Sequence, residues 1–367
     1  MELILYTIYY ISIAIIVINT IISFLNFIYI KIIFKREYEK LAYNSDFLVS
    51  ILIPARNEEK NILRSIESIL NQDYKNIEII VYDDQSEDKT SYLIEKFYKD
   101  KVKLIKGSNL EKGFIGKNFA CYKLSQISKG DYLLFMDADV EIHNKIIYKL
   151  IALSEKYNFE LISIFPYQIM KSFGEKISVP IIYYLLLSLL PLFLVDKVKN
   201  PLLSAANGQL MFFKAKTYKK LNPHYIFKSS TAEDIDIAKF YKKNNLKIAC
   251  FTGIKDVQCR MYNDLKDCIN GLSKNIIQIF LNNSIFAITF SIITTFGFLT
   301  ALIMKNYFLL ILYFIIFLLN RLFVYITSNI SLLPNLMISY VEQLLLIIIV
   351  FNSIINRNRL KWKGRDI

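Results

Sequence analysis

Long uncharged runs near both ends of the chain enclose a middle section in which apolar and polar residues alternate. Residues 3–30, 275–304 and 322–341 contain no charged side chain. A helix needs about 20 residues to cross a bilayer, so each run is long enough to span one. The first run is too long for the apolar part of a signal peptide and is predicted to remain as an anchor. The pattern therefore predicts an integral membrane protein.

The middle section reads as strands alternating with helices. Short apolar runs predict strands over 48–53, 77–81, 102–105 and 132–136. Apolar residues at helical spacing predict helices over 62–70 and around 120–127. Strand alternating with helix is typical of an α/β fold with a doubly wound, mainly parallel sheet, and this is the fold we expect.

Four regions follow from these patterns. We expect an N-terminal transmembrane anchor over 1–34, a cytoplasmic α/β domain over 35–274, a C-terminal transmembrane region over 275–356 and a basic cytoplasmic tail over 357–367. Positive residues favour the cytoplasmic side, and Lys31 and the tail carry such charges. The predicted location is the cell membrane, with the α/β domain in the cytoplasm.

Two segments leave alternatives open. The C-terminal region offers up to three crossings, over 275–304, 307–325 and 332–355. Three crossings would leave the basic tail outside, so either one segment is re-entrant or interfacial, or the tail breaks the charge rule. The uncharged run 177–195 is broken by Pro180 and Pro191, which favours a segment that lies in or dips into the membrane interface. A buried core helix is the alternative.

Composition narrows the class of protein further. Lys and Arg number 45 against 32 Asp and Glu, which gives a net charge of +13, and 54% of the residues are hydrophobic. The hydrophobic content excludes a disordered chain, and the scarcity of Gly (10) and Pro (7) excludes a collagen-like one. The chain has four scattered cysteines and only two histidines, His143 and His224. This argues against a disulfide scaffold and a Cys/His metal centre. We expect no nucleic-acid partner.

Acidic residues follow three of the predicted strands. Glu58 and Glu59 come after the first strand, Asp83 and Asp84 after the second, and an Asp-Ala-Asp triplet at 137–139 after the fourth. Ligands of open α/β sheets bind outside the carboxyl ends of the strands, so these loops are expected to meet at one cleft.

The triplet 137–139 is a candidate metal site because of its position. Another Asp-x-Asp occurs at 234–236, but in a helical pattern. Side chains two apart on a strand share a face, so Asp137 and Asp139 are expected to point the same way. Paired carboxylates suit a divalent cation that keeps positions open for phosphate oxygens. A solvated turn is the alternative.

Taken together, these motifs resemble family 2 glycosyltransferases of the GT-A fold, over about 47–262. The matching elements, in chain order, are SILIPARNEEKNI from Ser50, EIIVYDDQSEDKT from Glu78, DAD at 137–139, AANGQLMFF from Ala205, AEDIDIA from Ala232 and QCRMY from Gln258. The RMY ending and the terminal residues 362–365 resemble the membrane-bound branch that includes carotenoid- and hopanoid-associated enzymes. QCRMY departs from the Q-x-x-R-W pattern of processive synthases, which puts polymer synthesis in doubt.

The resemblance implies a donor site for a nucleotide sugar, here a UDP-sugar. The first two loops would hold the nucleoside, and Lys117 would lie beside the nucleotide. The residues implied are Pro54, Ala55, Arg56, Glu58, Asp83, Asp84 and Lys117. A favourable charge at a helix N-terminus is the alternative for Glu58 and Glu59. A solvated side chain is the alternative for Lys117.

It also implies the groups that carry the chemistry. Asp139 would bind Mg²⁺ or Mn²⁺, with Asp137 contacting the ion, its water or the ribose. Arg260 would neutralise the departing diphosphate. Asp234 would be the catalytic base that takes the proton from the acceptor hydroxyl. A helix N-cap is the alternative for Asp234.

The acceptor side is implied by position within the same motifs. Its expected residues are Asn207, Gly208, Glu233, Tyr262 and Trp362. A plain Asn-Gly turn is the alternative for the first two. The expected function is a metal-dependent, inverting transfer of a sugar to a membrane-resident lipid or isoprenoid. The alternatives are a polyprenyl-phosphate glycosyltransferase and a membrane transporter or scaffold with an inactive nucleotide-binding domain.

Overall fold

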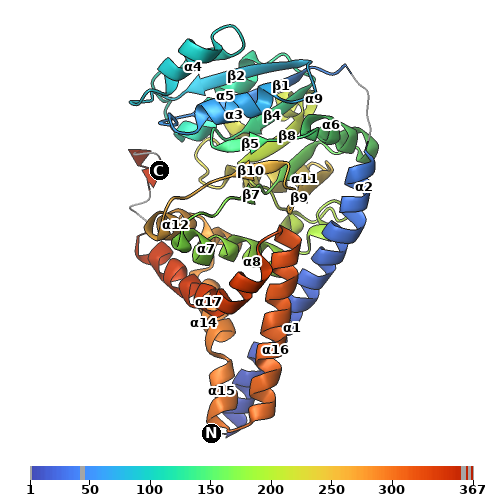
Figure 1. Cartoon of the computed structure of the whole chain (residues 1–367), viewed down its shortest axis with the longest axis vertical. Coiled ribbons are helices and arrows are strands. Elements are labelled where there is room, and N and C mark those ends of the chain that lie inside the picture. Colours follow the sequence, from blue (N-terminus) through green and yellow to red (C-terminus); the bar gives the residue numbers. More distant parts are fainter. Residues whose placement is uncertain (1, 42–45, 357–360, 363–364, 367) are drawn as a thin grey trace. The chain divides into compact units, whose positions relative to one another are not determined.

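The computed structural model describes residues 2–41, 46–356, 361–362 and 365–366 (Figure 1). The chain divides into two compact units, each built from three separate stretches. The apolar unit comprises Met1–Phe34, Met170–Phe193 and Tyr262–Leu360. The α/β unit comprises Lys35–Ile169, Leu194–Met261 and Lys361–Ile367.

The α/β unit alternates strands and helices, as the sequence predicts. Its strands are β1 (Val49–Ala55), β2 (Ile77–Asp83), β3 (Lys103–Lys106), β4 (Tyr132–Met136), β5 (Val140–Ile142), β6 (Leu161–Ile164), β7 (Tyr167–Gln168), β8 (Leu210–Lys214), β9 (Ile248–Phe251), β10 (Val257–Cys259), β11 (Lys361–Trp362) and β12 (Arg365–Asp366). Its α-helices are α2 (Lys35–Lys40), α3 (Ile62–Leu70), α4 (Thr90–Tyr98), α5 (Gly116–Ile127), α6 (Ile146–Tyr157), α9 (Ala215–Leu221), α10 (Pro223–Ile226) and α11 (Glu233–Lys243).

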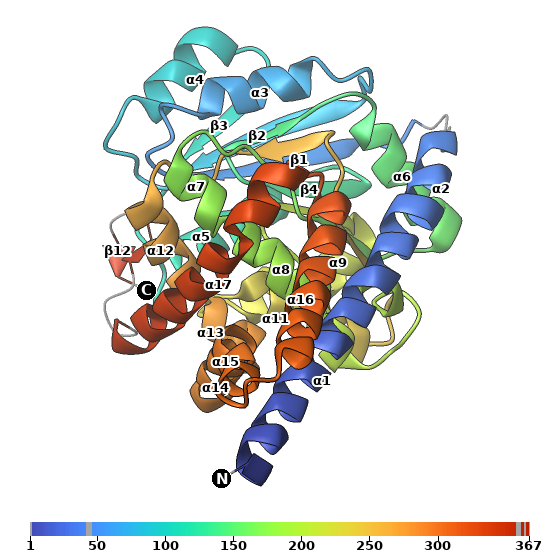
Figure 2. The ribbon, with the colours of Figure 1, turned by 60° about the horizontal axis from the view of Figure 1, so that its bottom comes forward.

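In the described residues the main sheet has seven strands in the order β3-β2-β1-β4-β8-β6-β9. All neighbours are parallel except β8, which runs antiparallel to both β4 and β6. Figure 2 shows α3 and α4 over one face of this sheet and α5 under the other. β1 and β4 are buried along their whole lengths, because helices cover both faces of the sheet. The predicted mainly parallel, doubly wound sheet is confirmed.

A small second sheet lies beside the main one, in the order β5-β10-β7. β5 starts one residue after the triplet 137–139, and Val140 pairs with Cys259 of β10. The triplet itself is a turn, in which the Val140 N–H donates to the Asp137 carbonyl over 3.1 Å. The strand geometry expected for Asp137 and Asp139 is therefore wrong. The chain has to turn there in order to pass from one sheet to the other.

The apolar unit is built from helices. They are α1 (Glu2–Phe27), α7 (Phe173–Ser178), α8 (Pro180–Leu189), α12 (Leu265–Ser273), α13 (Ile276–Ile279), α14 (Ser284–Phe296), α15 (Phe298–Ile303), α16 (Tyr307–Ser328) and α17 (Leu332–Ile355), with a π-helical extension of α1 over Ile28–Phe34 and a short 3₁₀ turn over Leu192–Leu194. Among the described residues, the helices over Glu2–Ile32, Tyr307–Ser328 and Leu332–Ile355 are long and apolar enough to cross a membrane. Figure 1 shows α1 and α16 side by side.

Polar residues in α1 follow the face that is buried against other helices. The buried residues of α1 are spaced three or four apart, and four of the six are polar: Ser12, Asn19, Ser23 and Asn26. The Asn26 side chain donates to the carbonyls of Leu187 and Leu190, both over 2.9 Å. Apolar surface gives little driving force for association in lipid, so polar contacts of this kind hold helices together.

The run 275–304 does not form one continuous helix. α13 ends at Ile279, and Leu281 and Asn282 then adopt positive φ angles. α14 and α15 follow on one another with only Gly297 between them, whose φ of −56° is right-handed helical. The length of the uncharged run therefore overestimates the length of the continuous helix. Hydropathy does not reveal the break at 280–283.

We predict that Gly130→Ala destabilises the α/β unit, because a Cβ at this position would lie 2.6 Å from the Ser50 backbone nitrogen in β1. Overpacking of this kind costs about 1–3 kcal/mol. The thermal unfolding midpoint of detergent-solubilised protein should fall. The exposed neighbour gives the control, since Lys129→Ala should leave the midpoint unchanged. Equal midpoints for the two variants would contradict the prediction.

Candidate functional site

The reversed direction of β8 brings two motifs together at one edge of the main sheet. Leu210, at the start of β8, pairs with Met136, at the end of β4. The residues just before β8 therefore lie beside those just after β4. The Asp137 N–H donates to the Gln209 carbonyl over 3.0 Å. The motif around Asn207 and the Asp-Ala-Asp turn thus share the carboxyl edge of the parallel strands.

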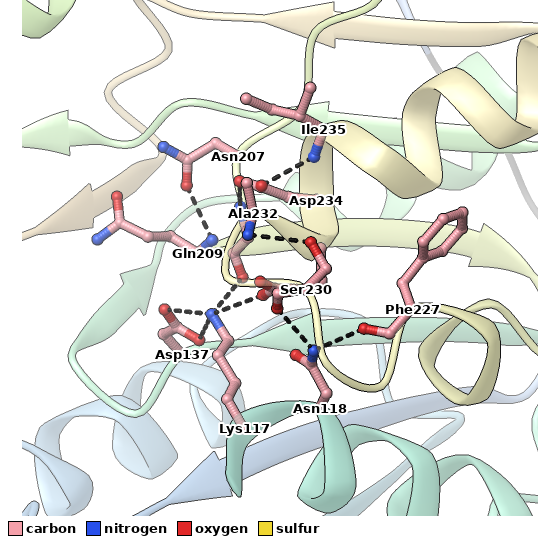
Figure 3. A network of polar contacts seen from close by, with 12 residues as sticks. Lys117, Asn118, Asp137, Asn207, Gln209, Phe227, Ser230, Ala232, Asp234 and Ile235 are labelled. Carbon is pink, nitrogen blue, oxygen red and sulfur yellow. Dashed lines mark hydrogen bonds and ion pairs between the residues drawn. The ribbon is translucent and has the colours of Figure 1, made fainter. Parts of the chain in front are cut away.

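Lys117 lies at the centre of this edge (Figure 3). It is the second residue of α5, and its side chain is 19% exposed. Its Nζ is 2.8 Å and 3.0 Å from the two carboxylate oxygens of Asp137, and it donates to the Gly208 carbonyl over 3.3 Å. Glu233 Oε1 lies 3.7 Å away. The solvated lysine that the sequence left open is therefore wrong.

Asp234 is joined to the same group of residues from the start of α11. Its Oδ2 accepts the Gly208 N–H over 2.9 Å, and its Oδ1 accepts the Ile235 N–H over 2.8 Å. The N-cap of α11 is Ala232, so Asp234 does not take the capping position that was the alternative. A Cβ on Gly208 would come within 3.1 Å of Lys117 Nζ and 3.3 Å of Glu233 Oε1, so a larger residue would crowd both side chains.

The Asn-Gly turn expected as the plain alternative is also present. The Asn207 side chain accepts the Gln209 N–H over 2.8 Å. Asn207 is fixed further by Ser163, whose hydroxyl accepts its N–H over 2.7 Å. The turn and the contact with Asp234 coexist, because the turn is what directs the Gly208 N–H toward α11.

The protonation of the acids is set by burial and by Lys117. Burial raises the pKa of Glu233 to about 7, against the opposing charge of Lys117. Burial also raises the pKa of Asp234, although the Ile235 and Gly208 N–H groups and Lys117 oppose it. Burial alone would lower the pKa of Lys117, but Asp137 and Glu233 outweigh it and raise that pKa. One cation thus faces three acids, two of which hold protons more tightly than usual.

Asn118 is a site residue that the sequence analysis missed. Its buried side-chain amide donates to the carbonyls of Phe227 and Ser230, both over 2.9 Å (Figure 3). The Ser230 hydroxyl accepts the Ala232 N–H, and it donates to Asp236 over 2.7 Å. Asn118 thereby fixes the loop that leads into α11. The sequence did contain one indication of its role, because Asn118 follows Lys117 at the start of a predicted helix.

The first two loops are tied mainly to each other. The Arg56 guanidinium donates to the carbonyls of Asp84 and Gln85 over 2.6 Å and 3.0 Å. The Asp83 carboxylate accepts the Ser86 N–H over 3.0 Å, and it also accepts the Ser91 hydroxyl. Their side chains therefore shape the loop after β2.

The remaining members of these two loops lie where the motif predicts. Pro54 and Ala55 end β1, and both are buried, as is Glu58. The Glu58 N–H donates to the Thr90 hydroxyl over 2.8 Å, which joins the first loop to the start of α4. The α3 helix starts only at Ile62, so Glu59 does not lie in its first turn. Contact of these loops with a nucleoside remains a prediction.

The QCRMY motif reaches the site through the small sheet. Its Cys259 pairs with Val140, which follows Asp139, and Arg260 is the next residue along. Tyr262 belongs to the apolar unit, where its ring fills the space beside Gly271. Trp362 lies in β11, but its side chain and Lys363 are outside the described residues. The roles of Arg260, Tyr262 and Trp362 remain predictions.

Asp137 and Asp139 supply oxygen ligands of the type that Mg²⁺ and Mn²⁺ prefer. The described residues contain no group of three or more His, Cys, Asp or Glu side chains arranged to hold a metal. The two carboxylates therefore fit an ion that takes its other ligands from a diphosphate, and they do not fit a closed protein site.

The cysteines and His224 do not contribute such a site. All four cysteines lie in the described part of the chain, where they are buried and free of disulfides. Burial raises the pKa of Cys259, with Asp139 and Asp137 adding to the effect. Burial lowers the pKa of His224 to about 3, and its ring lies 2.5 Å from the Tyr218 hydroxyl. These groups are structural.

Comparison with known proteins gives a consistent set of relatives. The chain is similar to 4,4'-diaponeurosporenoate glycosyltransferase of Staphylococcus haemolyticus, with 30% identity over 233 residues, which cover 62% of this chain and 60% of that protein. It is also similar to the Escherichia coli UDP-Glc:alpha-D-GlcNAc-diphosphoundecaprenol beta-1,3-glucosyltransferase WfaP, with 44% identity over 92 residues, which cover 25% of this chain and 35% of that protein. The chain thus spans less than two thirds of the length of either relative.

A solved structure supports the fold. The mannosyltransferase PcManGT from Pyrobaculum calidifontis, in complex with GDP-Man and Mn²⁺, aligns with a TM-score of 0.56 at 14% identity, over 95% of this chain and 99% of that one. The described sheet and helices have the GT-A architecture that the sequence motifs imply. The family model described as glycosyl transferase family 2 matches residues 50–221. The residues that this model matches make up slightly less than half of the chain.

Proposed function

We propose that this protein is an inverting glycosyltransferase that moves a sugar from a nucleotide sugar to a lipid held in the membrane. One observation carries the proposal: the ammonium group of Lys117 lies between Asp137 of the donor motif and Glu233 of the acceptor motif. In this proposal the groups that bind the donor and those that bind the acceptor are adjacent. A binding module without activity has no need for this arrangement of acids.

The donor is held at the carboxyl edge of the sheet in this proposal. The loops after β1 and β2 bind the nucleoside, and the diphosphate lies beside Lys117, Asp137 and Asp139. Lys117 is charged at neutral pH and stabilises the negative diphosphate directly. We take a UDP-sugar as the donor, in keeping with the UDP-Glc named for the E. coli relative.

Asp234 is the base in the transfer step. As the acceptor oxygen attacks the anomeric carbon, its proton passes to the Asp234 carboxylate. The bond between that carbon and the diphosphate oxygen breaks, and the nucleoside diphosphate leaves with the electron pair. A single attack from the opposite face inverts the configuration. The Gly208 N–H holds the Asp234 carboxylate in place for the transfer.

A divalent cation fits the same site. Asp139, together with Asp137 and the donor diphosphate, would hold Mg²⁺ or Mn²⁺, and the bound ion would stabilise the charge that develops on the leaving group. The Mn²⁺ present with PcManGT is in keeping with this proposal. Arg260 is the first residue after β10, and it would add a second positive charge at the diphosphate.

The path of the chain favours an acceptor in the membrane. The chain passes between the units at 169–170, 193–194 and 261–262, and the last of these junctions comes just after Arg260. The first follows β7, while the second leads toward Asn207 and Gly208. The S. haemolyticus and E. coli relatives are named for lipid acceptors. We further propose that the α/β unit faces the cytoplasm at the cell membrane.

The test is direct transfer in membranes. Membranes that contain the protein are incubated with a panel of radiolabelled nucleotide sugars, and the lipids are extracted. Label in the lipid fraction supports the proposal. Label that mild acid releases would indicate a polyprenyl-phosphate acceptor instead. Absence of both transfer and donor hydrolysis across the panel would favour a transporter or scaffold.

We predict that Asp234→Asn lowers transfer by about 10²–10⁴-fold, because a general base contributes that much. Donor binding should survive, since the base acts on the acceptor. Isothermal titration and transfer assays separate the two effects. Asp236→Asn is the matched control, because an asparagine still accepts the Ser230 hydroxyl. Wild-type turnover in Asp234→Asn would mean either another base or an acceptor that is already an anion.

We predict that transfer rises with pH through the neutral range. The base must be deprotonated, and burial raises the pKa of Asp234 above its usual 3.8 while that of Glu233 is raised to about 7. Glu233→Gln removes a neighbouring negative charge, so the acid limb of the profile should move to lower pH. The exposed Glu59→Gln serves as the control. A flat rate profile between about pH 5 and 8 would count against this assignment.

We predict that Asp139→Ala abolishes stimulation by Mn²⁺ and weakens donor binding, because this carboxylate would hold the ion that neutralises the diphosphate. Electron paramagnetic resonance of Mn²⁺ titrated with the nucleoside diphosphate should show less bound ion than in the wild type. The exposed Asp100→Ala is the control. Full activity of the wild type in excess chelator would exclude a metal role.

A further inference from the structure

The apolar unit contains a buried ion pair between two of its long helices. Arg321 is the single charged residue of α16, and Glu342 is the single charged residue of α17. Arg321 Nη1 lies 3.5 Å from Glu342 Oε2, and the two side chains are 1% and 0% exposed. Ionisable groups at such positions are costly in a membrane and point to a function.

The pair is part of a polar network that reaches other helices. The Tyr325 hydroxyl donates to Glu342 over 2.6 Å, and Arg321 also donates to the Gln343 side chain. Gln343 in turn donates to the Thr294 hydroxyl of α14 over 2.8 Å. α14, α16 and α17 are thus joined through side chains that face away from lipid.

Stability alone does not account for this arrangement. Within the described residues, Arg321 Nε and Nη1 and Glu342 Oε1 have no hydrogen-bond partner. Removing two charges from water costs free energy, and a buried pair with unsatisfied atoms recovers only part of it. Well-packed apolar side chains in the same positions would be at least as stable. The presence of a buried guanidinium is therefore better explained by the structural element that it holds in place.

Arg321 holds α8. Its guanidinium lies over the Tyr184 ring, 3.7 Å from the ring centroid. α8 has only ten residues and none of them is charged, so it is too short to cross a bilayer. Two further contacts fix it: Asn320 donates to the Ser188 hydroxyl over 3.0 Å, and Asn26 accepts the Leu192 N–H just beyond the helix over 2.8 Å.

The chain runs from α8 into the acceptor motif. In the α/β unit, Lys242 Nζ donates to the carbonyls of Val198 and Leu203 over 2.8 Å and 2.6 Å. Asn26 fixes the chain at Leu192, so only a few residues separate the two points of attachment. A displacement of α8 would act first on residues 193–197, which connect these two points.

We propose that Arg321 is a positioning residue for transfer to the lipid acceptor: through the Tyr184 ring it holds α8, and α8 fixes where the chain enters the stretch 194–209. This inference rests on the proposed function. It adds a residue far along the sequence from every motif that the resemblance identifies. The Arg321–Glu342 pair orients the guanidinium over the ring.

The test compares two aromatic residues that contact the same guanidinium. Tyr184→Leu removes the ring on α8, whereas Phe317→Leu removes a ring on α16 itself, 5.3 Å from the guanidinium. We expect Tyr184→Leu to raise the KM for the lipid acceptor about tenfold, the scale of a desolvated cation–π contact. Donor hydrolysis without acceptor should not change. Phe317→Leu and Tyr184→Phe, which keep the ring on α8, should retain the wild-type KM.

Hydrogen exchange gives a readout that does not depend on activity. Amides in 194–209 should exchange faster in Tyr184→Leu than in Phe317→Leu or the wild type. Equal exchange in all three, or equal KM changes in both leucine variants, would overturn the inference. If the wild type transfers sugar to no lipid, the proposed function fails, while the exchange comparison still decides whether Arg321 positions this segment.

Discussion

The arrangement of the α/β site depends on the balance of one ammonium group against three buried or half-buried acids. Lys117 neutralises Asp137 directly and lies within reach of Glu233, so the loops that carry these acids can approach one another. Without that cation, three acids at one sheet edge would repel each other and their burial would cost several kcal/mol. The reversed strand β8 supplies the geometry, because it starts where its neighbour β4 ends and places the Gly208 backbone against Asp234.

The sequence predicts the framework of this unit better than the details of its site. β1, β2 and β4 are recognisable because helices bury both faces of the sheet, which requires continuous apolar runs. The Asp-Ala-Asp triplet was expected to continue a strand, whereas it forms a turn between two sheets. That change depends on the pairing of Val140 with Cys259, more than a hundred residues away, which no local pattern encodes. The amide of Asn118 was overlooked for a similar reason, since its carbonyl partners come from a distant loop.

Hydropathy likewise identifies the apolar unit but conceals what holds it together. An averaged window treats Asn19, Ser23 and Asn26 as minor interruptions, although their spacing places them on one buried face. It treats Arg321 as a break in a segment, whereas the structure pairs it with Glu342. It also reads 275–304 as one span, although the chain turns at 280–283. For α1 and for Arg321, the partner of the polar residue, and not its own hydropathy, decides the local structure.

The interleaving of the two units has a consequence for how the protein is made. The Tyr9 hydroxyl of α1 donates to the Leu309 carbonyl of α16 over 2.7 Å, across a sequence separation of 300 residues. At a synthesis rate of about 5–20 residues per second, α1 waits roughly 15–60 seconds in the membrane before α16 emerges. During that time its buried polar face has no native partner from α16, and all seven strands of the main sheet are translated in between. The ribosome therefore completes the main sheet before α1 can pair with α16.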